Sequence, residues 1–353
     1  MKALLLAGGK GSRLQPLTNR LPKPMVPIMG KPLLERTIAN LKKSKIKEIV
    51  LSTCYQSNYI KEYFADGSQF DIKINYISED IPLGTGGAIK NAEKYFDDTF
   101  IVLNSDILTD INIDQLIKYH KSKSALATIV VTNVKNPSQY GVIEYDQEDY
   151  ITSFKEKPQP HEITSNYINA GVYVFEPQIF KEIPANRVVS IEKETYPMLL
   201  RKGYKVAAYK NDAYWLDIGT PEKYIAAHKD IMTGLCKIFN DSIEESYSFI
   251  GNLMLKGKNI RIHPEAKIIG PVYIGDNVSI EANAFVGPNV VIGDGSYIGM
   301  ESRIIGSILW DSVQVNRGVK LINTVVVSNC RIGGNKEIFN TVYTQDSNRM
   351  IAV

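Results

Sequence analysis

The chain has 353 residues, a length that favours two domains over one because a single hydrophobic core rarely grows so large. Its composition, 44% hydrophobic and 22% charged, is typical of globular proteins and excludes a disordered or collagen-like chain. The 41 basic and 38 acidic residues alternate along the sequence, so no basic block indicates a nucleic-acid partner.

Three further features limit the compartment and the chemistry. No apolar run approaches the roughly 20 residues that span a bilayer, and residues 3–7 are too short for a signal peptide, so we expect a cytoplasmic protein without a membrane partner. The cysteines, Cys54, Cys236 and Cys330, form no C-x-x-C pair, and we expect buried thiols. The four histidines lack metal-ligand spacing, so catalysis is expected to use Lys, Arg and carboxylates.

The first 235 residues alternate short apolar runs with amphipathic segments, which is typical of an α/β domain. Strands are predicted over residues 2–6, 48–53, 73–78, 100–104 and 125–132. Helices are predicted over residues 32–43, 56–64, 86–95 and 112–120. This order predicts a Rossmann-like, mostly parallel sheet with helices on both faces, where ligands bind at the carboxyl ends of the strands.

A second group of elements completes this domain, 1–235. Strands are predicted over residues 140–145, 151–154, 168–175 and 205–209. Helices are predicted over residues 192–200 and from Pro221, where Thr220 is the N-cap and proline takes the first helical position. Residues 236–258 are expected to connect the domain to a second one.

A six-residue period begins near residue 260. Branched aliphatic residues recur at every sixth position: Ile262, Ile268, Ile274, Ile280, Val286, Ile292, Ile298 and Ile304. This hexapeptide repeat predicts a C-terminal left-handed β-helix over residues 259–353. The register slips after Ile304 and resumes at Val313, which we interpret as a loop around Trp310. Residues 349–353 are expected to close the open end, and the flat walls to make the protein a homo-oligomer.

The first candidate functional motif directly follows the first predicted strand. It reads Leu6–Ala7–Gly8–Gly9–Lys10–Gly11–Ser12–Arg13–Leu14, and its glycines allow backbone N–H groups to approach phosphate oxygens. The motif lacks the third glycine of the dinucleotide fingerprint and the G-K-[ST] ending of a P-loop. A plain strand-to-helix turn is the alternative. Arg13, and Lys23 between two prolines, favour a phosphate-binding loop.

These residues resemble the signature of the sugar-nucleotidyltransferase family, G-x-G-x-R followed by P-K, met here by Gly9, Gly11, Arg13, Pro22 and Lys23. Further motifs extend the resemblance over nearly the whole chain: residues 83–88 (LGTGGA), 104–106 (NSD), 140–142 (YGV), 156–158 (EKP), 169–171 (NAG) and 215–219 (WLDIG). The NSD motif, residues 137–142, residues 190–194 and the short hexapeptide tail look most like the mannose-1-phosphate guanylyltransferase branch.

Two aspartates are candidate metal ligands. Asp106 follows an apolar strand, so its carboxylate is expected at the carboxyl edge of the sheet, where oxygen ligands suit Mg²⁺. A lone Asp after a strand is more often a cap or a turn residue, but Asp217 at a second strand end favours a pair that binds one ion. The family resemblance implies metal on both positions.

The resemblance also implies roles for the other motif residues. The nucleotide would contact Leu6, Ala7, Gly8, Gly9, Gly11, Ser12, Gly84 and Thr85. The sugar phosphate would contact Gly141, Glu156, Lys157, Asn169 and Gly171. The catalytic cations would be Arg13, Lys23 and Lys157. Without the resemblance, the same residues are interpreted as surface lysines, a solvated strand edge and turn residues.

The implied reaction is in-line attack of a sugar 1-phosphate on the α-phosphorus of a nucleoside triphosphate, with release of pyrophosphate. GTP and mannose 1-phosphate are the expected substrates, and glucose 1-phosphate with dTTP, UTP or GTP is an alternative. Hexapeptide β-helices also host acetyl transfer, for which His263 is the only candidate base. A non-catalytic regulatory protein is the third alternative, against which the intact Arg13, Lys23, Asp106 and Asp217 argue.

Overall fold

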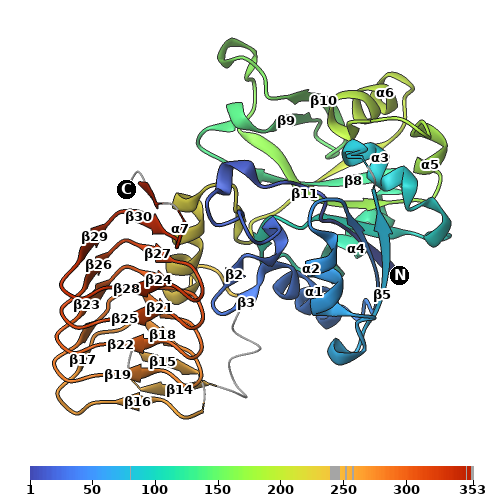
Figure 1. Cartoon of the computed structure of the whole chain (residues 1–353). Coiled ribbons are helices and arrows are strands. Elements are labelled where there is room, and N and C mark those ends of the chain that lie inside the picture. The colour runs from blue at the N-terminus through green and yellow to red at the C-terminus, as the bar shows by residue number, and fades with distance from the viewer. Residues whose placement is uncertain (80, 239–246, 251–252, 257, 347, 351–353) are drawn as a thin grey trace. The chain divides into compact units, whose positions relative to one another are not determined.

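The computed structural model describes residues 1–79, 81–238, 247–250, 253–256, 258–346 and 348–350 (Figure 1). The chain forms two compact units. We call the unit made of Met1–Lys10 and Thr37–Trp215 the sheet unit, and the unit made of Gly11–Arg36 and Leu216–Val353 the β-helix unit. Among the helices in the described ranges, none is long and apolar enough to span a bilayer.

A nine-stranded sheet with the order β10-β9-β11-β6-β1-β4-β5 forms the sheet unit, and β8 pairs with both β11 and β12. The strands are β1 (Lys2–Leu6), β4 (Glu48–Thr53), β5 (Lys73–Ser78), β6 (Phe100–Asn104), β8 (Ala127–Asn133), β9 (Gly141–Tyr145), β10 (Ile151–Glu156), β11 (Tyr167–Phe175) and β12 (Val206–Lys210). Strands β4, β1 and β6 pair in parallel, as do β4 with β5 and β12 with β8. Strand β11 runs antiparallel to β6, β8 and β9. The predicted Rossmann-like sheet is confirmed.

Helices follow the strands of this sheet. They are α1 (Leu33–Lys43), α2 (Ser57–Phe64), α3 (Gly84–Asn91), α4 (Ile113–Lys123), α5 (Ile179–Glu182) and α6 (Tyr196–Arg201). The helix predicted over residues 86–95 ends earlier, and a 3₁₀ turn covers Glu93–Tyr95. The helix predicted over residues 192–200 starts as a π-helix, Ile191–Thr195, before α6. In β1, Ala3, Leu4 and Leu5 are fully buried, as expected for a strand covered on both faces.

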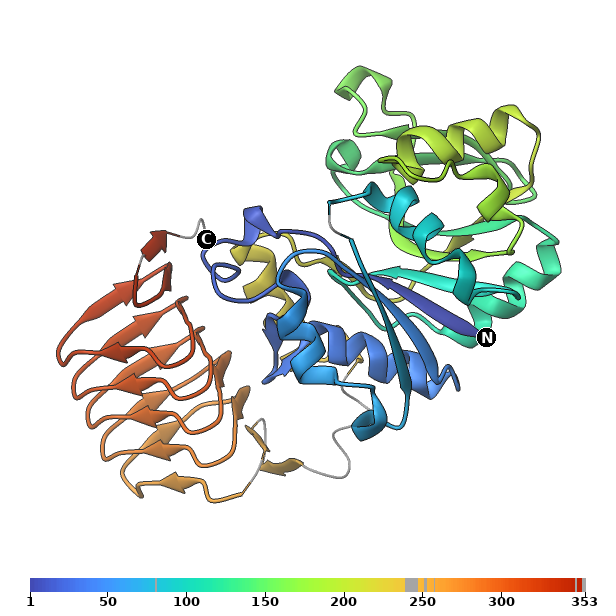
Figure 2. The same cartoon turned by 45° about the vertical axis from the view of Figure 1, so that its right-hand side comes forward.

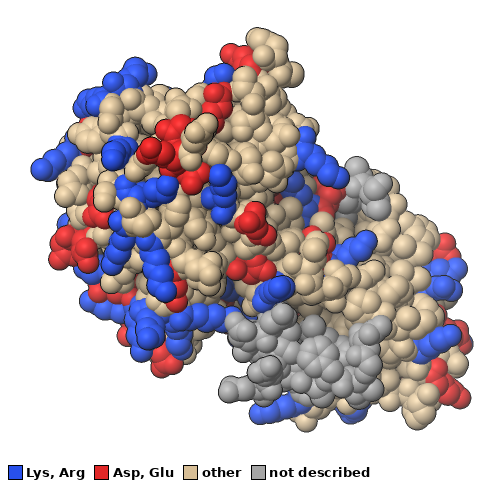
Figure 3. All heavy atoms as spheres, turned by 180° about the vertical axis from the view of Figure 1, so that it is seen from behind, with Lys and Arg blue, Asp and Glu red and all other residues tan. Residues whose placement is uncertain are grey.

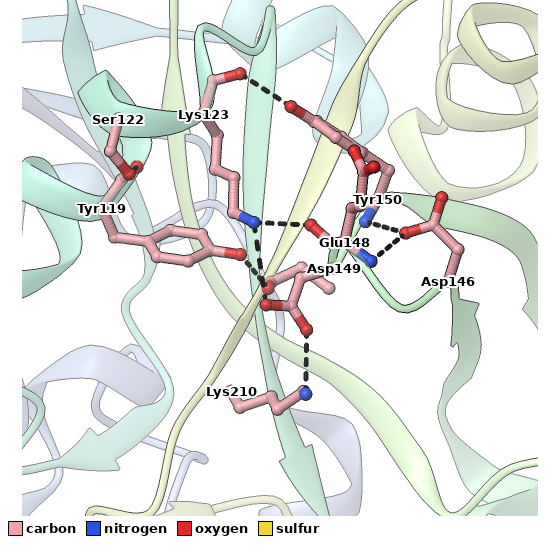
Figure 4. A network of polar contacts seen from close by, with 9 residues as sticks. Tyr119, Ser122, Lys123, Asp146, Glu148, Asp149, Tyr150 and Lys210 are labelled. Atoms are coloured by element: carbon pink, nitrogen blue, oxygen red, sulfur yellow. Dashed lines mark hydrogen bonds and ion pairs between the residues drawn. The ribbon is translucent and has the colours of Figure 1, made fainter.

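Polar contacts fix the turn between β9 and β10, the strand that ends in the EKP motif (Figure 4). The carboxylate of Asp149 pairs with Lys210 Nζ at 2.8 Å and with Lys123 Nζ at 3.8 Å. The hydroxyl of Tyr150 donates to the carbonyl of Lys123 at 3.1 Å, and Asp146 Oδ1 accepts from the Tyr150 N–H at 2.9 Å. The hairpin that carries the end of β10 is therefore tied to α4 and β12.

Short, mostly parallel strands build three sheets of the β-helix unit, and Figure 2 shows their coils stacked on one another. The first sheet holds β14 (Tyr247–Ile250), β15 (Leu253–Lys256), β18 (Val272–Ile274), β21 (Val290–Ile292), β24 (Ile308–Leu309), β27 (Val325–Val326), β30 (Thr341–Tyr343) and β31 (Asn348–Met350). The second holds β16 (Arg261–Ile262), β19 (Ser279–Ile280), β22 (Tyr297–Ile298), β25 (Gln314–Val315) and β28 (Arg331–Ile332). The third holds β17 (Lys267–Ile268), β20 (Phe285–Val286), β23 (Arg303–Ile305), β26 (Lys320–Ile322) and β29 (Glu337–Phe339).

The repeat changes register without forming a loop. Ile280 pairs with Ile298, but Ile298 pairs with Val315, so the later coil is one residue shorter. The predicted loop around Trp310 is wrong, because Trp310 directly follows β24 and is 6% exposed. The inward series continues through Leu309 and Val315, and Val313 takes the neighbouring buried position instead.

Other predictions for the C-terminal region have mixed outcomes. The closing segment is a hairpin in its described part, where β31 pairs antiparallel with β30, and residues 351–353 lie outside the described residues. The predicted connector includes β14 and β15, and β15 pairs in parallel with β18. Cys236 and Cys330 are buried as predicted, whereas Cys54, just after the end of β4, is only half-buried.

Two shorter stretches complete the β-helix unit. One contains the hairpin of β2 (Pro27–Ile28) and β3 (Lys31–Pro32), and the other contains α7 (Pro221–Met232), which follows β13 (Trp215–Asp217). Thr220 caps α7 as predicted, since its hydroxyl accepts the Lys223 N–H. Strand β7 (Ile107–Thr109) belongs to the sheet unit. On the face in Figure 3, basic and acidic side chains are intermingled.

Candidate functional site

The glycine loop leaves β1 at the carboxyl edge of the parallel strands. Its first turn is held by the neighbouring strand, because Ala7 N–H donates to the carbonyl of Ser52 at 2.8 Å. A Cβ on Gly8 would lie 3.3 Å from the Cβ of Cys54, whereas Gly9 has open space within 4 Å. Gly9 therefore offers the unobstructed backbone that close approach of a phosphate requires.

The NSD motif lies beside this loop. Asn104 pairs with Leu6 across β6 and β1, and the Ser105 hydroxyl donates to the Leu6 carbonyl at 2.6 Å. Asp106 follows in the turn and is half-exposed. The buried Oδ1 of Asn104 has no hydrogen-bond partner among the described residues. A carboxylate and an unpartnered amide oxygen close in sequence are the oxygen ligands that a hard divalent cation takes.

Asn169 and Gly171 form a bulge in β11. The Asn169 amide donates to the hydroxyl of Tyr173 at 2.8 Å and accepts the Gly171 N–H at 3.0 Å. Gly171 has φ +73°, and a Cβ there would lie 2.8 Å from the side-chain nitrogen of Asn104. The glycine therefore makes room for the Asn104 amide, which brings the NAG and NSD motifs together.

The EKP motif lies at the end of β10, where the Glu156 side chain is largely buried. The Glu156 side chain is 17% exposed, and its Oε1 lies 3.5 Å from Lys157 Nζ. A Cβ on Gly141 would lie 2.7 Å from the Phe154 ring and 2.9 Å from Glu156 Oε2, so only glycine leaves this space. Burial raises the pKa of the Glu156 carboxyl above its usual range, and the nearby Glu192 carboxylate raises this pKa further.

Glu192 belongs to the candidate site, although sequence reasoning did not single it out. Its Oε2 accepts hydrogen bonds from the hydroxyls of Thr85 at 2.6 Å and of Ser190 at 2.8 Å. The Thr85 oxygen in turn accepts the Ile191 N–H at 3.1 Å. Residues 190–194 entered the sequence reasoning only as a family motif. The contact with Thr85, 107 residues away, leaves no local signal in the sequence.

The glycines of the LGTGGA motif allow this contact. Gly84 has φ +73°, and a Cβ there would lie 2.6 Å from the carbonyl oxygen of Val189. The same oxygen accepts the N–H groups of Gly86 at 2.9 Å and Gly87 at 3.2 Å. The start of α3 is thus packed directly on the backbone before Glu192, and Gly84 and Thr85 join the Glu156–Glu192 group.

The β-helix unit carries the other half of the glycine motif. Gly11 has φ +64°, and a Cβ there would lie 2.9 Å from the Cβ of Lys23 and 3.1 Å from the methyl of Thr18. The Thr18 hydroxyl donates to the Gly11 carbonyl at 2.9 Å. Lys23 is 8% exposed, and Ser12 begins a 3₁₀ turn. Lys23 of the P-K motif therefore packs directly on Gly11 of the G-x-G-x-R motif.

Arg13 and Asp217 meet at Gly219 in the same unit. A Cβ on Gly219 would lie 3.2 Å from Asp217 Oδ2 and 3.4 Å from Arg13 Nη2. Asp217 is 8% exposed, and its Oδ1 forms an ion pair with Lys223 Nζ. Sequence reasoning assigned Lys223 no role in the site, although it predicted the helix start after Thr220 in whose first turn Lys223 lies.

The predicted residues thus fall into two groups. The sheet unit holds Leu6, Ala7, Gly8, Gly9, Gly84, Thr85, Asp106, Gly141, Glu156, Lys157, Asn169 and Gly171, and the β-helix unit holds Gly11, Ser12, Arg13, Lys23 and Asp217. Within the described residues, no group of three or more His, Cys, Asp or Glu side chains forms a ready metal site. His263, the base of the acyltransferase alternative, is exposed, and its Nδ1 accepts the Glu265 N–H at 3.3 Å.

The chain matches known families and relatives over most of its length. Residues 2–234 match the nucleotidyl transferase family, and residues 268–349 match the GMPPB C-terminal domain. The chain is 34% identical to a mannose-1-phosphate guanylyltransferase of Mycobacterium tuberculosis, covering 90% of this chain and 81% of that protein. It is 36% identical to a mannose-1-phosphate guanylyltransferase catalytic subunit beta of Xenopus tropicalis, over 82% of this chain and 74% of that protein. It is also 32% identical to a UTP–glucose-1-phosphate uridylyltransferase of Synechocystis, over 92% of this chain and 87% of that protein.

Solved structures resemble the chain over a smaller share. HddC from Yersinia pseudotuberculosis, complexed with GMP-PN, is 32% identical with a TM-score of 0.56, covering 65% of this chain and 99% of that chain. A putative glucose-1-phosphate thymidylyltransferase from Bacillus anthracis is 25% identical with a TM-score of 0.59, covering 64% and 93%.

Proposed function

Because the chain belongs to the nucleotidyl transferase family of sugar-1-phosphate enzymes, we propose that it transfers the guanylyl group of GTP to mannose 1-phosphate and releases pyrophosphate. The two guanylyltransferase relatives, which match over 90% and 82% of this chain, support these substrates. The uridylyltransferase relative makes glucose 1-phosphate with UTP the main alternative.

One observation carries the proposal most directly: the tight packing of Gly11 against Lys23, with Arg13 beside Gly219. The stem of Lys23 packs on the glycine-rich turn and the Arg13 guanidinium lies near the Asp217 carboxylate, which supports a site that uses both cations to bind a triphosphate. In the proposed complex, backbone N–H groups of residues 8–12 donate to phosphate oxygens. The planar guanidinium of Arg13 would bind the β- and γ-phosphates, and Lys23 would contact the α-phosphate.

The sheet unit would bind the sugar phosphate. Lys157 would donate a hydrogen bond to its phosphate, and the Glu156 carboxylate would accept a hydrogen bond from a sugar hydroxyl. Gly141 leaves room for that carboxylate, and the Glu192 carboxylate lies near enough to raise its pKa. The bulge of Asn169 and Gly171 would complete the sugar side. We extend this set to Glu192, which links it to the Thr85 loop.

We further propose that Asp106 and Asp217 hold Mg²⁺, since enzymes of this family typically use a divalent metal. The bound ion would neutralise charge on the triphosphate. The unpartnered Oδ1 of Asn104, two residues before Asp106, fits an oxygen-rich cation environment. The ion pair with Lys223 orients Asp217, whose other oxygen lies on the side of Gly219 and Arg13.

In the proposed reaction, an oxygen of the sugar 1-phosphate attacks the α-phosphorus, the bond from that phosphorus to the β-phosphate bridging oxygen breaks, and pyrophosphate leaves. No side chain needs to form a covalent bond. Lys23, Arg13 and Lys157 stabilise the negative charge that two phosphate anions bring together, so catalysis is positioning plus electrostatics.

A substrate matrix tests the proposal. ATP, CTP, GTP, UTP and dTTP are each combined with mannose, glucose, galactose and N-acetylglucosamine 1-phosphates and Mg²⁺, and pyrophosphate is measured. GTP with mannose 1-phosphate is expected to give the highest turnover. Glucose 1-phosphate is expected to follow, because one inverted hydroxyl is rejected strongly only where it leaves a buried polar group unpaired. A preference for UTP or dTTP would reject the guanylyl assignment, and no pyrophosphate from any pair would reject the transfer reaction.

A further inference from the structure

A buried hydrogen-bonded bridge runs from the β-helix to the hairpin that follows Lys23. The indole N–H of Trp310 donates to the hydroxyl of Tyr224 at 2.9 Å, and this hydroxyl donates to the carbonyl of Pro27 at 2.6 Å. Trp310 is 6% exposed and Tyr224 is fully buried. Since Trp310 directly follows β24 and Tyr224 lies on α7, the bridge joins three segments that are distant in sequence.

Three more contacts hold the same hairpin. The Met29 N–H donates to His228 Nε2 at 3.2 Å, while His228 Nδ1 lies 2.9 Å from the Tyr224 carbonyl. Burial lowers the pKa of His228 to about 4, so the ring is neutral at pH 7, as an acceptor must be. Arg36 donates to the carbonyl of Met29 at 2.9 Å. At the tip, a Cβ on Gly30 would lie 2.7 Å from the hydroxyl of Tyr273 in β18.

The chain between this hairpin and Lys23 is short and ordered. Pro24, Met25 and Val26 alone separate Lys23 from Pro27, and the Val26 N–H donates to the Lys23 carbonyl at 3.2 Å. Met25 and Val26 are buried. A displacement of the Pro27 carbonyl would therefore reach Lys23 through a 3₁₀ turn that has little freedom to absorb it.

We propose that Trp310 and Tyr224 are positioning residues through which the β-helix holds Lys23 in place for catalysis. This inference rests on the proposed function, in which Lys23 contacts the α-phosphate. The β-helix contributes to turnover without a substrate contact of its own.

The test compares full-length Tyr224→Phe and Trp310→Phe proteins with the wild type by hydrogen exchange and steady-state kinetics. Each variant keeps an aromatic ring: Tyr224→Phe removes both hydrogen bonds of the bridge, whereas Trp310→Phe removes the one that ties it to the β-helix. We expect amide exchange in residues 23–34 to rise about tenfold, with no change in β1 or in β18 and β21. The kcat is expected to fall about fivefold, as loss of one hydrogen bond allows, while KM for the nucleotide changes less than twofold. The double variant should lose no more than the larger single loss, because both changes break one bridge.

Tyr297→Phe is the matched control, since Tyr297 is a half-buried tyrosine of the β-helix in β22, and it should leave exchange and kcat unchanged. Unchanged exchange in residues 23–34, or a rise spread over the whole unit, would overturn the positioning role, as would losses that add in the double variant. A wild type that turns over no substrate would overturn the proposed function alone, because the exchange pattern still shows whether the bridge holds this segment.

Discussion

The sheet unit and the β-helix unit position their candidate residues in different ways. In the sheet unit, side chains position one another through hydrogen bonds and charge. Glu192 accepts hydrogen bonds from Thr85 and Ser190, and its carboxylate raises the pKa of Glu156. In the β-helix unit, backbone geometry dominates, with Gly11 at positive φ packed on Lys23. The first group is mainly acidic, whereas the second contributes most of the fixed positive charge.

This difference predicts how each group tolerates substitution. A network of side-chain hydrogen bonds survives an isosteric replacement that keeps the acceptors, so the loss reflects the removed charge. A group fixed by a left-handed glycine cannot accept even one added carbon without moving the backbone. Charge removal in the sheet unit should therefore affect mainly substrate binding and turnover, and methyl addition in the β-helix unit should affect both stability and turnover.

The largest effect is expected for Asp106→Asn in the sheet unit. The change keeps the shape and removes the charge proposed to bind Mg²⁺, so turnover should fall about 100-fold or more while the melting temperature stays unchanged. Excess Mg²⁺ should recover part of the loss. Asp97→Asn is the control, because the Asp97 side chain is 90% exposed. Near-normal turnover of the Asp106 variant at ordinary Mg²⁺ would show that the metal assignment is wrong.

Gly11→Ala tests the backbone-held group. Positive φ and the 2.9 Å approach to the Lys23 Cβ should lower the free energy of unfolding by about 2 kcal/mol, and turnover should fall about tenfold because Lys23 moves. Gly9→Ala is the matched control for stability, since a Cβ there meets nothing within 4 Å. Chemical denaturation measures the free energy of unfolding of the two variants. Equal stability of the two variants would contradict the packing of Gly11 on Lys23.

A smaller effect is expected for Glu156→Gln, which keeps an acceptor for the sugar hydroxyl. KM for the sugar phosphate should rise about fivefold. The raised pKa of Glu156 means that ionisation destabilises the folded wild type, so its stability contribution is present below the unfolded pKa and is lost as pH rises through the folded pKa. Denaturation from pH 4 to pH 8 should show this decline in the wild type and a weaker decline in the variant. Parallel curves would contradict the burial of an ionisable Glu156.

The sequence predicts the central strands well because each is a short segment rich in apolar residues that is bounded by polar residues or, after β1, by the glycine loop. Strands β1, β4, β5 and β6 have the predicted ends. The start of α3 was predicted too late, since Gly84 opens the helix through a left-handed turn that packs on Val189. That packing is tertiary and leaves no periodic signal.

Parts of the candidate site were beyond sequence reasoning for the same reason. The partners of Glu192 and Lys223 depend on which segments the fold brings together. The loop predicted around Trp310 was wrong for another reason. In the sequence, one residue missing from a regular repeat looks the same as an inserted loop. Only the strand pairing, Ile298 with Val315, separates the two.

Direct transfer without a covalent intermediate is the central claim, and isotope exchange tests it most directly. The wild type is incubated with GTP, labelled pyrophosphate and Mg²⁺, with and without GDP-mannose, and label in GTP is measured. Direct attack by the sugar phosphate predicts exchange only when GDP-mannose is present, since pyrophosphate can regenerate GTP only from the nucleotide sugar. Labelled GTP formed without any sugar compound would contradict the account, because it would require a nucleotidyl group held on the protein, with Lys23 or Lys157 as its carrier.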